Sequence, residues 1–503
     1  MADSAALLPR RDVAVIDIGS NSVRLVLYRC EGRAVWTLFN EKVLAGLGRD
    51  LGTTGALSPE GRDLALSALR RFRAVLDAIG PDQIEVVATA AMRDGSDAPD
   101  FARTITDQTG FQVRVLSGEQ EGRYAALGAL AGSPLASGLV ADMGGSSLEL
   151  IEAHGAPGRA ITLPLGAFAL MGPKGFDAAR TRKLVRQRLK GSAFSAPDAT
   201  LLAVGGSWRS LALLHMQMCD YPLRIVHQYA ISAREARSVI ELLERQSGPS
   251  LERIPGLSKK RIETLPYAAM VLEGLIERFD LKRVTFSAWG LREGVLFEAL
   301  GEPSREVDPL IAGSLALGTR AGLTPGLPDA LRRWLMPLMN ALPPALGDSE
   351  LAVARERTLV HAACALADVG AGFHPDHRAD LAFEQVLRAP VPGQTHQERA
   401  FLALAIHARY SSSPPPAPEL VERLLDEEVR QRARALGQAL RLGCDLSGRA
   451  TTLLEQSRLS AEDGLLILSV NHAWRALLMG EQTAKRAQAL ATTLGLDLVL
   501  NGT

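Results

Sequence analysis

Short runs of aliphatic and β-branched residues alternate with stretches of helical periodicity from Asp12 to about Gly301. Such alternation predicts α/β units, in which strands form a sheet and helices cover it. Ser58-Pro59-Glu60 marks one helix start, because proline is favoured in the first turn after a capping residue. The expected strands are 13–17, 23–28, 85–90 and 113–116 in the first unit, and 139–142, 148–153, 201–206 and 283–290 in the second.

The two units contain the same nine-residue pattern. Asp17–Leu25 reads D-I-G-S-N-S-V-R-L and Asp142–Leu150 reads D-M-G-G-S-S-L-E-L, so the two segments align without a gap. Each lies between two strand-like runs and predicts a β-hairpin with a tight turn of Gly, Ser and Asn. We therefore infer an internal duplication that gives two similar lobes facing each other across a cleft.

After Glu302 the strand-like runs disappear and apolar residues recur at helical spacing. The pattern predicts three domains: residues 1–135 as the first α/β lobe, residues 136–303 as the second lobe, and residues 304–503 as an all-helical domain. Within the third domain, Ser411–Pro416 reads as an exposed loop, or alternatively as a linker.

Composition narrows the class of protein. Lys plus Arg and Asp plus Glu both number 56, so the overall charge does not indicate a nucleic-acid partner. No apolar run approaches the roughly 20 residues of a membrane helix, and Met1–Arg11 lacks the apolar core of a signal peptide. We expect a cytoplasmic protein that does not contact a membrane. The four cysteines are scattered and predict neither a zinc ribbon nor a disulfide framework.

The repeated hairpins suit phosphate binding, because glycine exposes backbone N–H groups and serine adds hydroxyl donors. The candidate phosphate-binding residues are Gly19, Ser20, Asn21 and Ser22 in the first hairpin and Gly144, Gly145, Ser146 and Ser147 in the second. Asp17 and Asp142 end the preceding strands, where a carboxylate can hold a divalent ion or a water, or alternatively cap the turn. Neither G-x-x-x-x-G-K-[ST] nor a G-x-G-x-x-G after a strand occurs, which excludes the two commonest nucleotide-binding signatures.

Five segments in family order resemble the exopolyphosphatase and guanosine pentaphosphate phosphohydrolase (Ppx/GppA) family. They are Asp17–Ser22, Ala88–Asp94, Ser117–Glu121, Asp142–Ser147 and Gly290–Gly294. The resemblance covers about 300 residues and implies actin-like lobes of the actin, sugar-kinase and heat-shock ATPase (ASKHA, ribonuclease H-like) superfamily.

The resemblance also implies roles for single residues. Glu121 matches the catalytic glutamate that activates the attacking water, and Arg93 matches a phosphate-binding arginine. Asp142 and Glu149 match positions associated with Mg²⁺, directly or through water. Gln120 stands where the family usually has a glutamate, and Ser146 replaces a glycine of the second hairpin while keeping a hydrogen-bond donor. Gly206 and Ser207, in a segment resembling the family's G-G-T, add backbone N–H groups at a helix start, or alternatively only pack there.

A long polyanion requires a basic surface. Six basic residues within eleven positions, with no acid among them, are the candidate patch: Arg180, Arg182, Lys183, Arg186, Arg188 and Lys190. The alternative is an ordinary solvated helix face. Two weaker candidates are Lys259–Arg261 and the arginines at 430, 432 and 434.

The helical domain contains scattered histidines and the segment Leu366–Gly370, L-A-D-V-G, which looks like the L-H-D-x-G segment of histidine–aspartate metal phosphohydrolases with alanine in place of histidine. Loss of that ligand argues against an active two-metal centre. We expect a degenerate HD-like domain that serves dimerisation or grips distal polyphosphate.

The leading hypothesis is removal of terminal orthophosphate from inorganic polyphosphate, with Mg²⁺ and, as an open question, a monovalent cation such as K⁺. Hydrolysis of the 5′ γ-phosphate of guanosine pentaphosphate (pppGpp) at the same site is the alternative, and ppGpp is then a further ligand. A polyphosphate–nucleoside diphosphate phosphotransferase and a non-catalytic alarmone sensor are two further hypotheses. The resemblance implies a homodimer.

Overall fold

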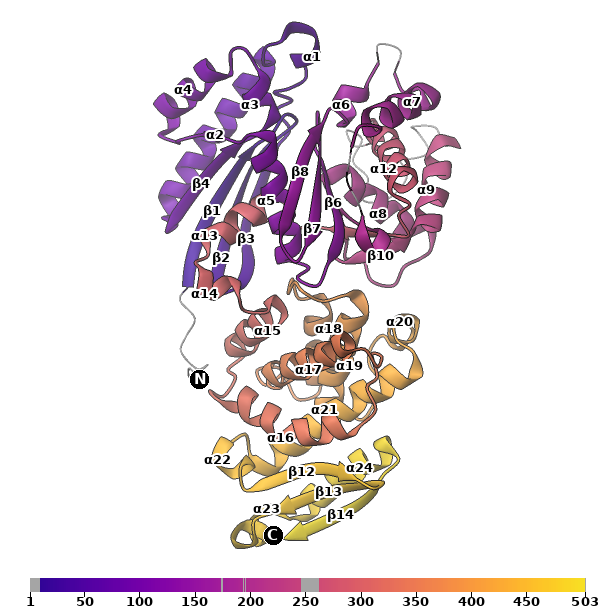
Figure 1. The fold of residues 1–503 in the computed structure, drawn as a ribbon. Coiled ribbons are helices and arrows are strands. Elements are labelled where there is room, and N and C mark those ends of the chain that lie inside the picture. The colour runs from indigo at the N-terminus through magenta and orange to yellow at the C-terminus, as the bar shows by residue number, and fades with distance from the viewer. Residues whose placement is uncertain (1–9, 173–174, 193, 195, 246–261, 503) are drawn as a thin grey trace. The chain divides into compact units, whose positions relative to one another are not determined.

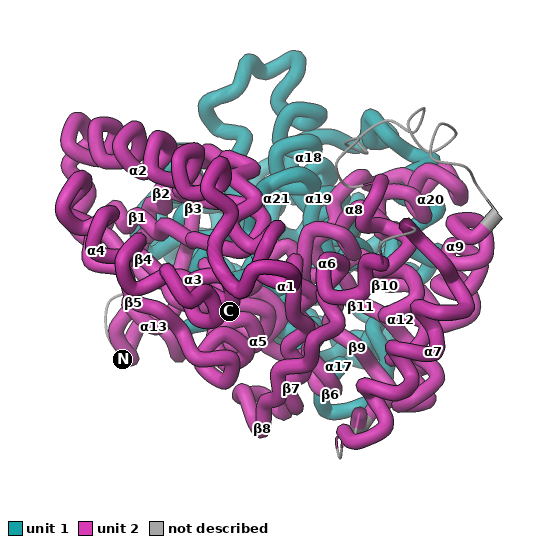
Figure 2. Tube along the Cα trace, turned by 90° about the horizontal axis from the view of Figure 1, so that it is seen from above, with its two compact units in different colours: residues 1–8, 307–503 teal, residues 9–306 magenta. Residues whose placement is uncertain are grey.

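The structure is a computed structural model that describes residues 10–172, 175–192, 194, 196–245 and 262–502. The chain forms two compact units, one from Pro9 to Glu306 and one from Val307 onwards, which Figure 2 colours separately. The division between the α/β region and the C-terminal region falls after Glu306, three residues later in the sequence than the predicted division after residue 303. In the described part of the chain, no helix is long and apolar enough to cross a membrane.

The first lobe is built on a five-stranded sheet in the order β3-β2-β1-β4-β5. Its strands are β1 (Arg10–Ile18), β2 (Val23–Glu31), β3 (Ala34–Val43), β4 (Gln83–Ala88) and β5 (Arg114–Val115). The first three form an antiparallel meander, and β4 and β5 continue in parallel from β1. Its helices are α1 (Leu51–Thr54), α2 (Pro59–Ile79), α3 (Ala90–Asp94) and α4 (Ala98–Thr109).

The second lobe repeats this topology in a six-stranded sheet ordered β10-β11-β9-β6-β7-β8. Its strands are β6 (Ser137–Met143), β7 (Leu148–His154), β8 (Pro157–Leu163), β9 (Thr200–Val204), β10 (Tyr229–Ser232) and β11 (Arg283–Ser287). The order β8-β7-β6-β9-β11 matches β3-β2-β1-β4-β5, and β10 is an addition at the edge. The duplication inferred from the two hairpins is therefore confirmed at the level of the whole sheet.

The helices of the second lobe begin where the sequence changes from strand to helical periodicity. Those in the described part of the lobe are α6 (Ala167–Leu170), α7 (Ala178–Leu189), α8 (Gly206–Met218), α9 (Ala233–Arg245) and α12 (Leu265–Phe279), and a 3₁₀ turn spans Pro197–Ala199. All eight strands expected from the sequence are present, whereas β3, β8 and β10 were not predicted. The first two carry several polar or glycine residues and expose part of one face, so their periodicity is weak.

Two helices cross from one lobe to the other. Helix α5 (Gly118–Ala131) follows the first sheet in the chain but packs on the second, where Ala126 and Leu130 join Val140 and Ile151 in a buried cluster. Helix α13 (Leu291–Ala299) follows the second sheet but packs on the first, against Val13 and Val15. Figure 1 shows α5 between the two sheets. The expected boundary at residue 135 therefore separates the two copies of the sequence repeat. It does not separate the packed lobes, because α5 and α13 each pack on the sheet of the other lobe.

Two glycines allow α5 and α13 to approach at backbone distance. A Cβ atom on Gly128 of α5 would lie 1.9 Å from the backbone oxygen of Gly290, and one on Gly294 of α13 would lie 1.9 Å from the backbone oxygen of Tyr124. Any side chain at either position would collide with backbone that cannot move independently. The crossing therefore depends on the absence of side chains at these two positions.

The C-terminal unit is mainly helical. After α14 (Glu302–Arg305), which ends the first unit, it contains α15 (Pro309–Arg320), α16 (Leu327–Ala341), α17 (Glu350–Ala365), α18 (Arg378–Arg388), α19 (His396–Tyr410), α20 (Pro418–Leu424), α21 (Glu427–Ser447), α22 (Thr451–Leu454), α23 (Arg475–Leu478) and α24 (Glu481–Leu494). Side-chain caps at Asp308, Thr395 and Asp426 begin three of these helices. The predicted loop at Ser411–Pro416 separates α19 from α20.

The expectation that residues 304–503 are all helical is wrong at the C-terminal end. A three-stranded sheet, ordered β12-β13-β14, is formed by β12 (Ser457–Glu462), β13 (Leu465–Val470) and β14 (Asp497–Gly502). Asp463 and Gly464 join β12 to β13 with φ values of 51° and 80°, the left-handed pair required by a two-residue hairpin turn. The Asp-Gly pair followed by alternating burial in β13 is a hairpin signal. The sequence prediction missed it because the helical periodicity of the preceding region was extended to the C-terminal end.

Candidate functional site

The first hairpin joins β1 to β2 at the carboxyl end of β1. The backbone N–H of Gly19 donates to the backbone oxygen of Ser22 at 3.0 Å, which closes the turn. The backbone N–H of Gly48, in the loop after β3, donates to the backbone oxygen of Ser20 at 2.8 Å and so holds the turn in place. Ser20, Asn21 and Ser22 consequently line a common cavity, as the sequence predicted.

The second hairpin reproduces the first. The N–H of Gly144 donates to the oxygen of Ser147 at 3.0 Å, the same bond at the equivalent position. The N–H of Gly166 donates to the oxygen of Ser146 at 3.2 Å, and that of Phe168 to the oxygen of Gly145 at 2.8 Å. All four residues of this turn line the cavity, and the hairpin with Ser146 closes with the same backbone bond as the first hairpin.

A third group of N–H donors lies where β9 ends and α8 begins. Gly205 has φ 121°, and a Cβ atom there would lie 2.6 Å from the backbone oxygen of Met143, so this position requires glycine. Gly206 and Ser207 follow at the start of the helix and line the same cavity. The N-terminus of α8 thus directs unpaired backbone donors and the positive end of the helix dipole into the cavity.

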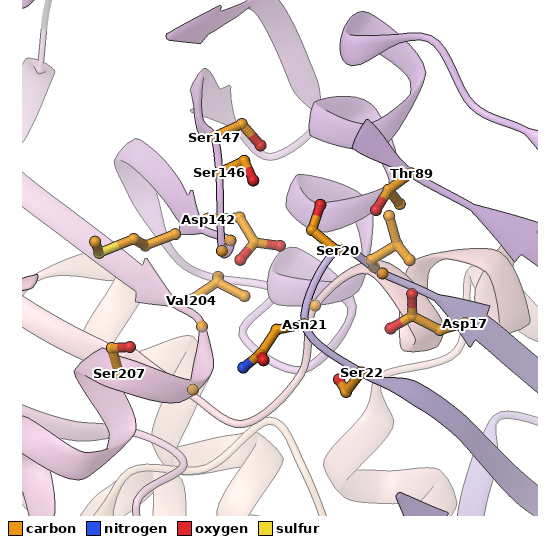
Figure 3. Close-up of a pocket in the computed structure, with 18 of the residues that line it drawn as sticks. Asp17, Ser20, Asn21, Ser22, Thr89, Asp142, Ser146, Ser147, Val204 and Ser207 are labelled. Atoms are coloured by element: carbon orange, nitrogen blue, oxygen red, sulfur yellow. The ribbon is translucent and has the colours of Figure 1, made fainter. Parts of the chain in front are cut away.

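The cavity has a volume of about 500 Å³ and is lined by residues of both lobes. Figure 3 shows side chains from three stretches of chain, around Ser20, Ser146 and Ser207, gathered around one space. Hydroxyl groups and backbone N–H groups line the cavity, and its four cationic side chains, Arg24, Lys42, Arg209 and Arg292, outnumber its carboxylates, Asp17, Glu121 and Asp142. Such a lining suits a polar anionic ligand.

Glu121 lies in the first turn of α5 and is one of the residues that line the cavity. Arg93 of α3 donates from Nη1 to Glu121 Oε2 at 3.0 Å and to the backbone oxygen of Leu116 at 3.3 Å. Burial raises the pKa of Glu121 to about 7, although Arg93 acts in the opposite direction. A carboxylate with a pKa near neutrality is suited to accept a proton from water at physiological pH.

The residues next to Glu121 have other roles. Ser117 and Gln120 form a capping box: the Ser117 hydroxyl accepts from the N–H of Gln120 at 3.2 Å, and the Gln120 amide oxygen accepts from the N–H of Ser117 at 3.0 Å. Glutamine can complete a capping box as glutamate does, so Gln120 has a local structural role at the start of α5. Glu119 is exposed and does not line the cavity, in contrast to the buried Glu121.

Asp142 and Glu149 are direct partners across the β6–β7 hairpin, so two carboxylates lie side by side on one face of the sheet. Burial, opposed by Arg209, raises the pKa of Asp142 to about 6. Burial and then the charge of Glu121 raise the pKa of Glu149 well above its ordinary value. Both groups are therefore held in an environment that disfavours their negative charge.

A divalent cation fits this environment. Glu149 Oε1 is buried and has no hydrogen-bond partner among the described residues, so it can serve as a ligand without breaking another bond. In the described ranges no group of three or more His, Cys, Asp or Glu side chains is placed to hold a metal. Mg²⁺, however, commonly binds through one or two carboxylates together with phosphate oxygens and water.

Asp17, the third residue predicted to bind metal, is engaged in a different way. Arg292, at the start of α13, donates from Nη1 to Asp17 Oδ2 at 3.2 Å. Burial raises the pKa of Asp17 despite this partner. The neighbouring Glu293 accepts from Tyr28 at 2.6 Å and from the N–H of Gly290 at 2.9 Å, so the helix start is tied firmly to the first lobe. Arg292 therefore both joins the lobes and lines the cavity.

Several cavity residues were not predicted from the sequence. Arg24 is the direct partner of Asp17 on one side and of Lys42 on the other, so the sheet register places two cations beside the first hairpin. Arg209 and Thr89 also line the cavity. The aligned hairpins contained one signal, because Arg24 occupies the position of Glu149 in the duplicate. The charge opposite the hairpin aspartate is thus reversed between the lobes.

The predicted polyanion patch lies on α7, outside the cavity lining. Arg182 pairs with Glu273 at 2.6 Å and with Glu244, and Arg186 pairs with Glu277 at 3.0 Å. Arg180 and Arg188 donate to backbone oxygens at Leu170 and Ala169. Lys183 and Lys190 are exposed. The arginines thus already have protein partners, and polyanion binding at this helix stays a prediction.

The two weaker basic candidates differ. Lys259–Arg261 lies outside the described residues. In α21, Arg430 and Arg434 pair with Glu427, and Arg432 lies 3.6 Å from the buried Glu356. These arginines therefore stabilise the C-terminal unit locally.

Asp368, in the segment for which the sequence suggested an HD-like resemblance, lies beside arginines. Asp368 is 1% exposed, and its Oδ1 lies 3.7 Å from Arg449 and 4.0 Å from Arg409. The histidines do not converge on it; His407, for example, pairs with Asp380 at 3.4 Å. Two guanidinium groups thus lie close enough to offset the charge of Asp368, and the resemblance to an HD domain stays a prediction.

Comparisons with known proteins agree with this arrangement. Residues 25–302 match the Ppx/GppA phosphatase family, and residues 343–500 match the C-terminal domain of exopolyphosphatases. The chain is 27% identical over 476 residues to Retrograde regulation protein 2 of Saccharomyces cerevisiae, covering 87% of this chain and 79% of that protein.

Solved structures show the same fold in the first unit. A Ppx/GppA family member from Aquifex aeolicus is 25% identical, with a TM-score of 0.52 over 58% of this chain and 98% of its own. An exopolyphosphatase from Cytophaga hutchinsonii is 22% identical and resembles the chain in fold, with a TM-score of 0.52 over the same 58% and 98% of its own chain. The actin-like α/β fold expected from the sequence is therefore confirmed, and the chain belongs to the Ppx/GppA phosphatase family.

Proposed function

We propose that this protein removes the terminal phosphate from inorganic polyphosphate by hydrolysis, with Glu121 as general base. The observation that carries the proposal is the position of Glu121: a buried carboxylate, held by Arg93 at 3.0 Å, in a cavity that two phosphate hairpins also line. A water between Glu121 and the terminal phosphorus would lose its proton to the carboxylate as its oxygen attacks. The bond from the terminal phosphorus to the bridging oxygen breaks, so the leaving group is the polyphosphate chain shortened by one unit and the other product is orthophosphate.

The other residues distribute the negative charge of the substrate. Backbone N–H groups and hydroxyls of both hairpins, with Gly206 and Ser207, are suited to hold phosphate oxygens as negative charge develops on them. The planar guanidinium of Arg93 can bridge Glu121 and a phosphate oxygen, which keeps the base and the substrate in fixed relation. Arg24, Arg209 and Arg292 add positive charge around the same cavity.

Mg²⁺ fits Asp142 and Glu149, the paired carboxylates described above. When bound, the ion would polarise phosphate oxygens and offset the repulsion between substrate and carboxylates. Asp142 and Glu149 then lose the unfavourable environment that raises their pKa values in the metal-free protein. We also propose, from the family relationship alone, that the protein is a homodimer and that pppGpp is an alternative substrate.

A regulatory role is the second candidate, because a relative that matches 87% of this chain is named for retrograde regulation. A protein that only sensed a phosphorylated ligand would need the hairpins and not the general base. The presence of Glu121 in ion-paired contact with Arg93 supports catalysis as the first hypothesis. Binding without turnover would favour the second.

Orthophosphate release by the purified full chain distinguishes these possibilities. Long-chain polyphosphate and pppGpp are compared at matched terminal-phosphate concentration with Mg²⁺, and nucleoside diphosphate is added in a parallel reaction. Faster release from polyphosphate supports the proposal, and faster release from pppGpp changes the substrate but not the chemistry. Formation of nucleoside triphosphate would identify a phosphotransferase. Tight binding of either substrate with no release above the buffer rate would contradict the hydrolytic proposal.

A further inference from the structure

The C-terminal unit contains a group of six charged side chains that the proposed hydrolysis does not use. We call it the arginine cluster, and it consists of Arg409, Arg441, Arg449, Arg486, Asp368 and Asp445. The residues come from α19, from α21 and the turn after it, from α24 and from the HD-like segment. Helix α21 packs against both α19 and α24, which brings these segments together.

Asp445 is shared by three arginines. Arg486 Nε lies 3.2 Å from Asp445 Oδ2, Arg441 Nε lies 3.9 Å from the same oxygen, and Arg409 Nη1 lies 3.8 Å from Oδ1. Only the first of these contacts is a hydrogen bond. One carboxylate therefore partly balances three guanidinium groups, and the other two guanidinium groups are not hydrogen-bonded to it.

The second carboxylate of the cluster, that of Asp368, also lacks hydrogen-bond donors among the described residues. Both carboxylate oxygens of Asp368 are buried without a hydrogen-bond partner among the described residues, although Arg409 and Arg449 lie within 4.0 Å. Arg409 Nε is also buried without a partner. Buried charged groups at this separation are normally completed by a further polar group, because each missing hydrogen bond is costly.

The cluster has more positive than negative charge, with four guanidinium groups around two carboxylates. Arg441 feels this excess most directly. Its pKa is lowered first by burial and then by the nearby charges of Arg486 and Arg409, and Asp445 compensates only in part. Within the described residues, the guanidinium of Arg441 has no hydrogen-bond acceptor. An added anion would remove the repulsion and supply that acceptor.

We propose that the arginine cluster is a second anion-binding site, separate from the hydrolytic cavity, and that it takes an oxyanion of the phosphate class mainly through Arg441, with Arg486 beside it. Arg486 is already partly engaged, because its Nε donates to Asp445 at 3.2 Å and its Nη2 lies 2.8 Å from the side-chain oxygen of Gln482. Guanidinium groups match phosphate oxygens with two parallel hydrogen bonds, which favours phosphate over a spherical anion such as chloride. A metal ion does not suit the position, because both carboxylates already face guanidinium groups. The site does not depend on the hydrolysis proposed for the other unit.

Titration calorimetry of the full-length protein with inorganic pyrophosphate, with divalent ions chelated, tests the site. The wild-type protein is expected to bind at the arginine cluster, and R441Q/R486Q to lose this binding by about tenfold or more in affinity. R357Q/R475Q is the matched control, since both arginines are exposed in the same unit and lie outside the cluster. The circular dichroism spectrum and thermal denaturation midpoint of R441Q/R486Q, compared with those of the wild type, show that the variant is folded.

Asp445→Asn supplies a test with the opposite sign. This substitution removes a carboxylate that competes for the arginines, so pyrophosphate should bind several-fold more tightly, an effect that misfolding cannot imitate. Titrations with tripolyphosphate and with GDP identify the source of the ligand, an inorganic chain or a nucleotide. Unchanged pyrophosphate binding in R441Q/R486Q, or weaker binding in D445N, would overturn the proposal.

Discussion

Asp142 and Glu149 face each other across the β6–β7 hairpin, at the position where the first lobe pairs Asp17 with Arg24. The duplicated hairpins thus differ in charge: one sets an acid against a base and the other an acid against an acid. Like charges directly opposite each other destabilise a sheet. The repulsion between Asp142 and Glu149 lowers stability, and a bound cation would offset it. The proposed site would thus hold the cation at the second hairpin and the phosphate chain between the two hairpins.

Removing the buried charge of Asp142 should stabilise the metal-free protein. Because burial raises the pKa of Asp142 from 3.8 to about 6, ionisation at neutral pH favours the unfolded chain. In a chelator at pH 7.5, Asp142→Asn should raise the free energy of unfolding of this unit by on the order of 1–3 kcal/mol. The gain should shrink as the pH falls from about 6 towards 3.8, where the folded carboxyl is protonated.

Chemical denaturation at pH 7.5 and at pH 5 measures this effect. Asp63→Asn, at an exposed position of α2, is the control and should leave stability unchanged at both pH values. If D142N is no more stable than the wild type in chelator at pH 7.5, burial does not disfavour the charged form of Asp142, which would contradict the prediction.

Magnesium should stabilise the wild type more than a variant that lacks one of the two paired carboxylates. The proposed ion would bind only the folded protein, so at tenfold excess over its dissociation constant it should stabilise the wild type by about 1.4 kcal/mol. Glu149→Gln should lose most of this increment, because it removes one of the paired carboxylates. Thermal denaturation with and without Mg²⁺ measures the difference. An equal increment in E149Q and D63N would exclude Glu149 from the metal site.

Arg93 should set the pH at which hydrolysis begins. It lowers the pKa of Glu121 against the larger effect of burial, so Arg93→Met should raise that pKa and move the acidic limb of the kcat/KM profile to higher pH by about one unit. The maximal rate should also fall if Arg93 binds phosphate as proposed. Arg103→Met, an exposed arginine of α4, is the control. A lower rate with an unmoved acidic limb would show that Arg93 binds phosphate without tuning Glu121.

The crossing of α5 and α13 should tolerate no side chain. Gly128→Ala would place Cβ 1.9 Å from the backbone oxygen of Gly290, so we expect a loss of at least about 3 kcal/mol. Gly52→Ala, in α1, meets no atom within 4 Å and should be neutral or slightly stabilising. Chemical denaturation of both variants tests this, and a stable G128A would mean that the helices can separate without unfolding the lobes.

The sequence predicts the parts of the site that lie within one hairpin and misses those that the sheet assembles. The gapless repeat at Asp17 and Asp142 was sufficient to predict both hairpins and the duplicated fold. Lys42 and Arg209 carry no local motif, and only strand register and the start of α8 bring them to the cavity.

The C-terminal unit shows a different limit. Helical periodicity dominates this part of the chain, and β12 to β14 were missed because their alternation is short and follows a long helical region. Asp463-Gly464, with both φ values positive, was the usable local signal. Similarly, the alanine before Asp368 argued against a metal centre, but nothing in the local sequence indicated that Arg409 and Arg449 would stand beside it.

The most direct test of the hydrolytic account is the rate of orthophosphate release from polyphosphate by Glu121→Gln compared with Glu119→Gln. Both substitutions remove one carboxylate from the first turn of α5, but only Glu121 is buried in the cavity. The account predicts that E121Q loses activity by roughly 10²–10⁴-fold with polyphosphate binding retained, whereas E119Q resembles the wild type. Equal activity of the two variants would contradict the assignment of Glu121 as the general base.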